Sequence, residues 1–286
     1  MNKLLAAFAV VLSGAAIWLA AGGETFERVD AGGHPVRILR EGRGGPTVVF
    51  EAGAGGSLES WVRIQPEVAR FTSTIAYDRA GNGLSPRGRA AREGRQIARE
   101  LHQALLSAHA SPPYLLVGHS LGGPFIRVFA GMYPDEVAGM ILVDPTQEEL
   151  IAWSKARNTN SVAPEKHRWY DEVDCAPETF AQAHESMVPP GIPVALICGM
   201  GPRTIPEFVP QEVREDLRHD HDVLYPAKLK FHREWLEKIP DGQLIVTENS
   251  GHGIPYEEPE LVIKTIRAMV EQIRAGVARA ATGKPN

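Results

Sequence analysis

Cysteine is scarce in this chain, with two residues among 286. Cys198 lies in an apolar run typical of a buried strand, and Cys175 lies in a polar, helix-like region, so we interpret Cys198 as an inert buried thiol. The two cysteines and the scattered histidines form no group with metal-ligand spacing. We therefore expect neither a metal nor a cofactor.

An excess of positive charge is also missing. The 30 lysines and arginines are outnumbered by 35 aspartates and glutamates, which gives a formal net charge of -5 and a pI near 6.1. Nucleic-acid binders usually present a basic face, so this balance argues against nucleic acid as a partner. The densest basic stretch contains Arg92, Arg95 and Arg99, whose spacing predicts the solvated face of a helix.

A long apolar run occurs only in the first residues. Met1-Asn2-Lys3 supplies a basic start, residues 4–21 are apolar, and polarity returns at Glu24. This pattern is typical of a signal peptide over residues 1–23, so we predict an exported protein, periplasmic or secreted, whose mature chain begins near residues 21–23. The 18 uncharged residues of the run also reach the lower length limit of a membrane-spanning helix, so an uncleaved N-terminal membrane anchor is the alternative.

Short apolar runs alternate with amphipathic stretches over residues 24–286. This alternation predicts one α/β domain, with an eight-stranded, mostly parallel sheet and helices on both faces. The first two strands are expected to form a hairpin. The expected strands are 25–31, 36–40, 47–51, 74–78, 114–118, 140–144, 194–198 and 244–247. Apolar residues at three- and four-residue spacing predict helices over 58–70, 95–110, 121–133 and 258–277.

Residues 146–190 interrupt this alternation. The segment is polar, contains aromatic residues such as Trp153 and Phe180, and has no strand-like run. Because a structureless loop of this length is unusual inside a compact domain, we predict a helical insertion that covers a functional site, and we call it the cap. A second long stretch, 199–241, is predicted to flank the same cavity.

A serine lies between two glycines in the segment Gly118-His119-Ser120-Leu121-Gly122. A strand-like run precedes the segment and an amphipathic run follows it, which is the arrangement of a nucleophile elbow. In so tight a turn, side chains at the two glycine positions would collide with neighbouring backbone. Ser120 is therefore the predicted nucleophile, whereas the adjacent His119 is expected to pack or to line the pocket.

On these residues the chain resembles the α/β-hydrolase fold family, in its serine esterase and lipase branch with a GHSLGG elbow. Residues 51–56 are similar to the family's oxyanion loop, although Ala52 stands where a histidine is usual. The resemblance implies that the backbone N–H groups of Ala54 and Leu121 form the oxyanion hole. It also implies that Asp78, in a turn after the fourth strand, is structural. Because the nucleophile is serine, the resemblance does not extend to the dehalogenases and epoxide hydrolases of this fold, which use aspartate.

His252 lies between two glycines, after the last expected strand and before the last expected helix, where the family keeps its general base. The acid has two candidate positions. Asp144 ends the sixth expected strand, at the sheet edge where ligand-facing groups gather, and is the predicted acid. A helix cap is its alternative role. Glu207, well after the seventh strand, is the reserve.

A serine, an acid and a histidine in this order imply acyl transfer to serine and hydrolysis of the acyl-enzyme. We therefore predict a carboxylesterase acting on small-molecule esters. Three alternatives stay open. The same residues are compatible with amide or peptide cleavage, as in prolyl aminopeptidases, and with carbon–carbon cleavage, as in hydrolases of meta-cleavage products. The third is a non-catalytic, ligand-binding member of the fold.

Overall fold

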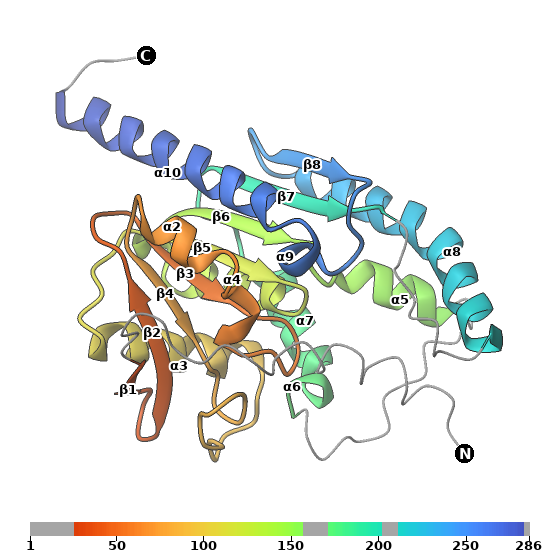
Figure 1. The fold of residues 1–286 in the computed structure, drawn as a ribbon, viewed down its shortest axis with the longest axis horizontal. Helices are drawn as coiled ribbons and strands as arrows, with labels where there is room; N and C mark the ends of the chain where they lie inside the picture. Colours follow the sequence, from red (N-terminus) through yellow and green to blue (C-terminus); the bar gives the residue numbers. More distant parts are fainter. Residues whose placement is uncertain (1–25, 157–170, 202–210, 283–286) are drawn as a thin grey trace.

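The computed structural model describes residues 26–156, 171–201 and 211–282 (Figure 1). The predicted signal segment, the predicted mature start and Glu207 lie outside these residues. Within the described ranges, no helix combines the length and the apolarity needed to cross a bilayer.

The described strands form one eight-stranded sheet in the order β1-β2-β4-β3-β5-β6-β7-β8. β1 and β2 form the expected antiparallel hairpin, and β2 also pairs with β4 in antiparallel fashion, whereas the other pairs are parallel. The strands are β1 (Phe26–Asp30), β2 (Pro35–Glu41), β3 (Thr47–Glu51), β4 (Thr74–Tyr77), β5 (Tyr114–His119), β6 (Val137–Val143), β7 (Val194–Gly199) and β8 (Gln243–Thr247). The predicted mostly parallel, eight-stranded sheet is confirmed.

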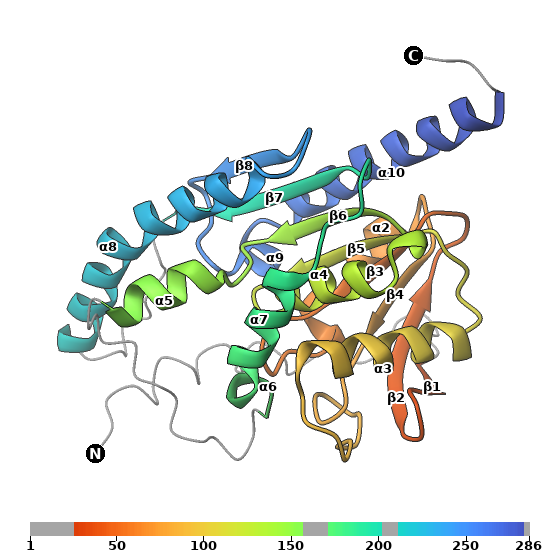
Figure 2. The ribbon, with the colours of Figure 1, turned by 180° about the vertical axis from the view of Figure 1, so that it is seen from behind.

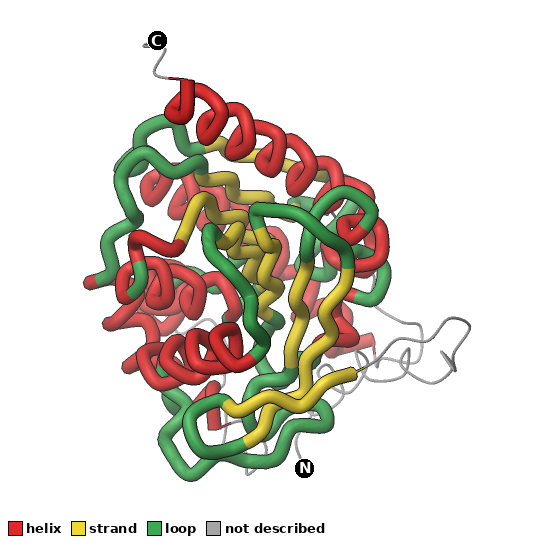
Figure 3. The backbone as a smooth tube through the Cα atoms, turned by 90° about the vertical axis from the view of Figure 1, so that its left-hand side faces the viewer, coloured by secondary structure: helices red, strands yellow, loops and turns green. Residues whose placement is uncertain are grey.

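Helices cover both faces of the sheet (Figures 1, 2 and 3). One face carries α2 (Gln65–Ala69), α9 (Ile254–Glu257) and α10 (Pro259–Thr282), which lie in front of the sheet in Figure 1. The other face carries α3 (Gly94–Ser107), α4 (Gly122–Met132) and α8 (Gln211–Leu236), which Figure 2 shows in front. Two short 3₁₀ helices, η2 (Leu58–Trp61) and η3 (Pro134–Glu136), lie in connections.

The central strand β5 explains why the sheet needs cover on both faces. Leu115 and Val117 pack in one apolar cluster with residues of α2 and α10, whereas Leu116 packs in a second cluster with residues of α3 and α4. All six residues of β5 are buried. A parallel strand that is buried on both faces has a continuous apolar sequence rather than an alternating one, as observed here.

The cap contains three described helices between β6 and β7: α5 (Glu148–Ala156), α6 (Asp171–Asp174) and α7 (Ala176–Glu185). Residues 157–170 of the predicted cap lie outside the described residues. Phe180 of α7 packs against Leu121 and Phe125. The cap therefore rests on the first turn of the helix that follows the elbow.

One sequence-based interpretation needs correction. Arg92 was assigned to a solvated helix face, but α3 begins at Gly94, and Arg92 is buried and donates two hydrogen bonds to Glu100, at 2.7 and 2.6 Å. The stretch 199–241, which is predicted from the sequence to flank the cavity, contains the long helix α8. Cys198 is buried as expected, and burial raises the pKa of its thiol to about 12.

Candidate active site

The elbow between β5 and α4 holds Ser120 in a strained backbone conformation. Its φ is +54°, in the left-handed region that L residues other than glycine rarely adopt. The flanking glycines allow this turn, because a Cβ on Gly118 would lie 2.5 Å from the carbonyl oxygen of Gly122. A Cβ on Gly122 would lie 2.4 Å from the carbonyl oxygen of Glu51. The collisions expected from the sequence are therefore present, and the second one involves the end of β3, where the loop 51–56 begins.

That loop, residues 51–56, packs directly on the elbow. A Cβ on Gly53 would lie 3.1 Å from the Cβ of Ser120, so the loop lies against the serine at the residue before Ala54. Ala54 is exposed, and Leu121 is the N-cap residue of α4. Within the described residues, neither of their N–H groups donates to another backbone group. Both donors are thus available to a bound ligand.

The structure brings Ser120, His252 and Asp144 together from three parts of the chain. The Oγ of Ser120 lies 2.9 Å from the Nε2 of His252, and the Nδ1 of His252 lies 2.7 Å from the Oδ2 of Asp144. Because an ionised carboxylate only accepts, His252 carries its proton on Nδ1 and leaves Nε2 to accept from the serine hydroxyl. The side chain of His252 is 57% exposed, so the imidazole is open to a substrate.

Asp144 directly follows β6, with a φ of +40°, and is buried. Its Oδ1 accepts from the backbone N–H of Gly199 at 2.9 Å and from the Nζ of Lys228 at 2.8 Å. Burial favours the neutral acid, but the hydrogen bond from His252 and the charge of Lys228 outweigh it and hold the pKa of Asp144 well below its usual range. These partners do not belong to a helix N-terminus, and α5 begins only at Glu148, so Asp144 is not a helix cap.

Lys228 is a component of the site that sequence reasoning missed. It lies on α8, is buried, and also donates to the carbonyl oxygen of Gly199 at 2.5 Å. Burial opposes its charge, yet Asp144 holds the pKa of the ammonium above its ordinary value. No sequence signal distinguishes this lysine from the other charged residues of the same polar stretch. Only the packing of α8 over the ends of β6 and β7 brings it to the acid.

His119 supports the histidine loop. Its Nε2 donates to the backbone carbonyl of His252 at 2.8 Å, and the two rings lie 4.9 Å apart. Burial, together with the nearby His252, lowers the pKa of His119 to about 4, so the ring is neutral at pH 7. The sequence predicted packing or pocket lining, and the structure adds this hydrogen bond.

Asp78 lies apart from this group and has structural partners. It is fully buried and accepts hydrogen bonds from the backbone of Leu58 at 2.9 Å and of Leu84 at 2.8 Å, and from the Nε of Arg37 at 2.7 Å. These bonds hold the turn after β4 to its neighbours, as a structural aspartate would.

One group of side chains in the described residues has the proximity that metal binding requires, namely Glu148, Glu149 and His184 of the cap. The carboxylate of Glu148 already accepts two hydrogen bonds from Arg127, at 3.0 and 2.9 Å. This bidentate pairing gives the Glu148 carboxylate a partner of opposite charge within the protein.

Comparisons with known proteins agree with this architecture. A family model described as alpha/beta hydrolase fold matches residues 46–163. The haloalkane dehalogenase DbeA from Bradyrhizobium elkani USDA94 has a TM-score of 0.65 at 16% identity, over 89% of this chain and all of that one. A thermophilic esterase from Thermogutta terrifontis has a TM-score of 0.58 at 18% identity, over 87% of this chain and 99% of that one.

A curated relative, the uncharacterized protein YqjL of Bacillus subtilis (strain 168), is 28% identical over 78% of this chain and 83% of its own length. The sheet order, the elbow and these matches define an α/β-hydrolase fold. The chain has the α/β-hydrolase fold, and its residues 46–163 match the model of that family.

Proposed function

We propose that the protein is a serine hydrolase that cleaves carboxylic esters of small molecules through an acyl-enzyme. The observation that supports this most is the continuous hydrogen-bonded path from the Oγ of Ser120 through His252 to Asp144, at 2.9 and 2.7 Å, with the serine on a strained elbow. The proposal goes beyond the fold, which many unrelated activities share.

In the proposed reaction, the Nε2 of His252 accepts the hydroxyl proton as the Oγ of Ser120 attacks the ester carbonyl. The negative oxygen of the tetrahedral intermediate accepts hydrogen bonds from the N–H groups of Ala54 and Leu121. His252 then donates its proton to the departing alcohol. Water activated by the same histidine hydrolyses the acyl-enzyme. Asp144 stays ionised throughout and stabilises the imidazolium.

Among the reactions that a serine nucleophile can perform, ester cleavage is supported by the fold likeness to a thermophilic esterase. The test is a substrate panel for the purified protein: p-nitrophenyl esters of increasing acyl length, proline p-nitroanilide, and a meta-cleavage product. We expect kcat/KM to be highest for one of the esters. A higher kcat/KM for the anilide or the ring-cleavage product would replace the ester proposal with that alternative.

The roles of the two reacting side chains have their own test. Ser120→Ala and His252→Ala should each lower kcat by about 10³-fold or more, and the double variant should be hardly worse, because the two residues act as one unit. Near-additive losses would contradict this assignment. If the wild-type protein turned over no substrate of the panel and a fluorophosphonate probe failed to label it, a non-catalytic binding protein would be the better account.

A further inference from the structure

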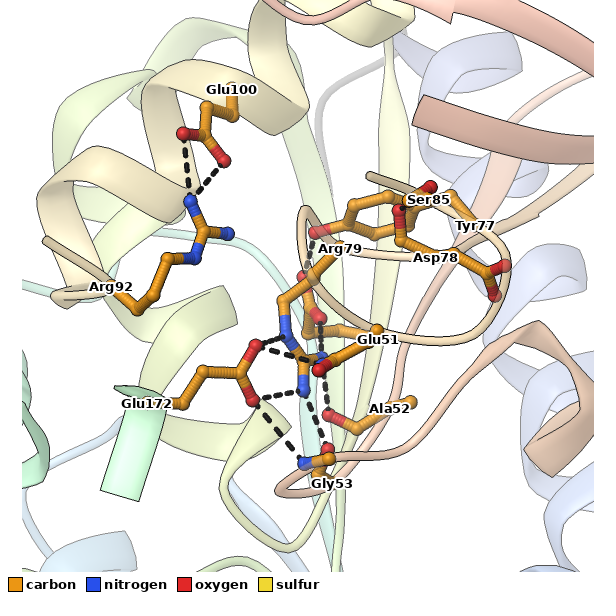
Figure 4. Close-up of polar contacts among 12 residues, drawn as sticks. Glu51, Ala52, Gly53, Tyr77, Asp78, Arg79, Ser85, Arg92, Glu100 and Glu172 are labelled. Atoms are coloured by element: carbon orange, nitrogen blue, oxygen red, sulfur yellow. Dashed lines mark hydrogen bonds and ion pairs between the residues drawn. The ribbon is translucent and has the colours of Figure 1, made fainter. Parts of the chain in front are cut away.

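A buried arginine, Arg79, contacts the oxyanion loop (Figure 4). The side chain of Arg79 is 1% exposed, and all five of its N–H groups have acceptors. The Nε donates to Glu172 at 2.6 Å, and one terminal nitrogen donates to Glu51 at 2.5 Å and to the carbonyl of Ala52 at 2.8 Å. The other donates to the carbonyl of Gly53 at 2.6 Å and again to Glu172 at 2.7 Å. Arg79 thus joins the loop to Glu172.

These bonds fix the peptide planes on both sides of Ala54. The Gly53–Ala54 peptide is trans, so its C=O and its N–H point in opposite directions within one plane. Because Arg79 holds the carbonyl of Gly53, the N–H of Ala54 must point away from Arg79. The following N–H, that of Gly55, donates to the carboxylate of Glu172 at 3.3 Å. Ala54 is therefore clamped between an arginine on one peptide and a glutamate on the next.

The clamp combines two parts of the fold. Arg79 follows β4, whereas Glu172 lies on α6 of the cap. Glu172 is buried, and it also accepts from the side-chain amide of Asn82 at 2.9 Å. Although burial disfavours its charge, Arg79 and the hydrogen bonds hold the pKa of Glu172 below its ordinary value, so it acts as an anion. Docking of α6 and the geometry of the oxyanion loop are therefore linked through one carboxylate.

We propose that Glu172 and Arg79 are positioning residues for the backbone donor of Ala54, and that the cap must be docked through Glu172 for this donor to be aligned. This inference rests on the proposed function, in which Ala54 stabilises the oxyanion. It gives the cap a role beyond covering the site: the cap supplies one side chain that completes the oxyanion hole indirectly.

Glu172→Gln is the informative substitution. It removes the charge and the bidentate acceptor, because an amide offers one oxygen and would turn an NH₂ group toward other donors. Arg79 retains Glu51 as an anionic partner, so no buried cation is left unpaired and the variant should fold. Glu148→Gln is the matched control. It breaks another bidentate arginine–carboxylate pair between the cap and the core, with Arg127 of α4, and leaves the oxyanion loop untouched.

Kinetics on the best ester of the panel give the first readout. Because an oxyanion donor acts mainly in the transition state, Glu172→Gln should lower kcat by roughly 10- to 100-fold and change KM by less than about threefold. Its preference for an oxygen ester over the matching thionoester should fall by a similar factor, since sulfur accepts hydrogen bonds weakly and gains little from an aligned donor. Glu148→Gln should change kcat by less than about threefold.

Hydrogen exchange gives a second readout that does not depend on turnover. A peptide covering residues 53–56 should exchange about tenfold faster in Glu172→Gln than in wild type or Glu148→Gln, because the N–H of Gly55 loses its anionic acceptor. Equal kcat values for Glu172→Gln and Glu148→Gln would overturn the positioning role. A higher KM with an unchanged kcat in Glu172→Gln would overturn it as well. Unchanged exchange would overturn the clamp itself. If the wild type showed no Ser120-dependent turnover, the proposed function would fail, while exchange would still decide whether Glu172 holds the loop.

Discussion

Replacing the acid beside His252 should damage stability as well as activity. Asp144→Asn removes a negative charge from a site where the ammonium of Lys228 is buried and lies 2.8 Å from Oδ1. In the variant, Lys228 keeps the carbonyl of Gly199 and gains a neutral amide oxygen, but it has no anion. A cation buried without a counter-charge is strongly unfavourable.

The expected loss of unfolding free energy in Asp144→Asn follows from two estimates. Breaking a buried ion pair by removing one partner destabilises proteins by about 3–5 kcal/mol. Lys228 can avoid an unpaired charge by releasing its proton, and at pH 7 this costs about 5 kcal/mol, because an ordinary lysine titrates roughly 3.4 pH units higher at ~1.4 kcal/mol per unit. The carbonyl of Gly199 offsets part of the penalty. We expect Asp144→Asn to lose about 3 kcal/mol of unfolding free energy at pH 7.

Urea unfolding and ester turnover should be measured on Asp144→Asn and on the double variant that adds Lys228→Met. The single variant should lose up to roughly 10⁴-fold in kcat and be less stable at pH 7, with a deficit that shrinks toward pH 10 as Lys228 releases its proton. The double variant should recover most of the stability and none of the kcat. If Asp144→Asn were as stable as wild type, or if adding Lys228→Met lowered stability further, the reasoning would be refuted.

Gly122→Ala should destabilise the fold by several kcal/mol in thermal unfolding, because the new Cβ would meet a carbonyl oxygen at 2.4 Å. Gly276→Ala, on open helix surface, should stabilise the fold by about 0.5–1 kcal/mol. Equal effects of the two substitutions would contradict the close contact at Gly122. Burial lowers the pKa of both His119 and His232 to about 4, so the native state binds fewer protons than the unfolded state between about pH 6.5 and pH 4. The unfolding free energy should fall as pH drops through that window, and a flat profile would argue against burial of the two rings. The mature protein should be recovered outside the cytoplasm with a first residue near 21–23, and intact Met1 on soluble cytoplasmic protein would contradict a signal peptide.

The sheet could be predicted from the sequence because buried parallel strands have short, nearly uniform apolar runs. Residues 47–51 illustrate this, since the expected and observed limits of β3 coincide. The expected limits of β6 were shifted by three residues at its start, because Val137 and Ala138 follow a turn and are not set apart by composition. The positions of Ser120 and His252 in the chain order could also be predicted, because glycines with a steric reason flank Ser120 and because His252 follows the last strand.

The supporting charges were not readable, because they depend on contacts between distant segments. Lys228 reaches Asp144 across 84 positions, and Glu172 reaches Arg79 across 93. Lys228 and Glu172 each lie in a polar stretch among other charged residues, and the spacing of those residues does not distinguish them. Glu51 ends β3 and Arg79 lies just after the neighbouring β4, and this pair offered a weak signal. Opposite charges at adjacent strand ends are expected to pair when both become buried.

The central claim is that Ser120 forms a covalent acyl-enzyme, and intact-protein mass spectrometry during ester turnover tests it most directly. Quenching in acid within the first turnovers should reveal a species heavier by the mass of the acyl group, and peptide mapping should locate that group on Ser120. His252→Ala should form this species far more slowly. An acyl group on another residue, or ester turnover that continues in Ser120→Ala at the wild-type rate, would contradict the account.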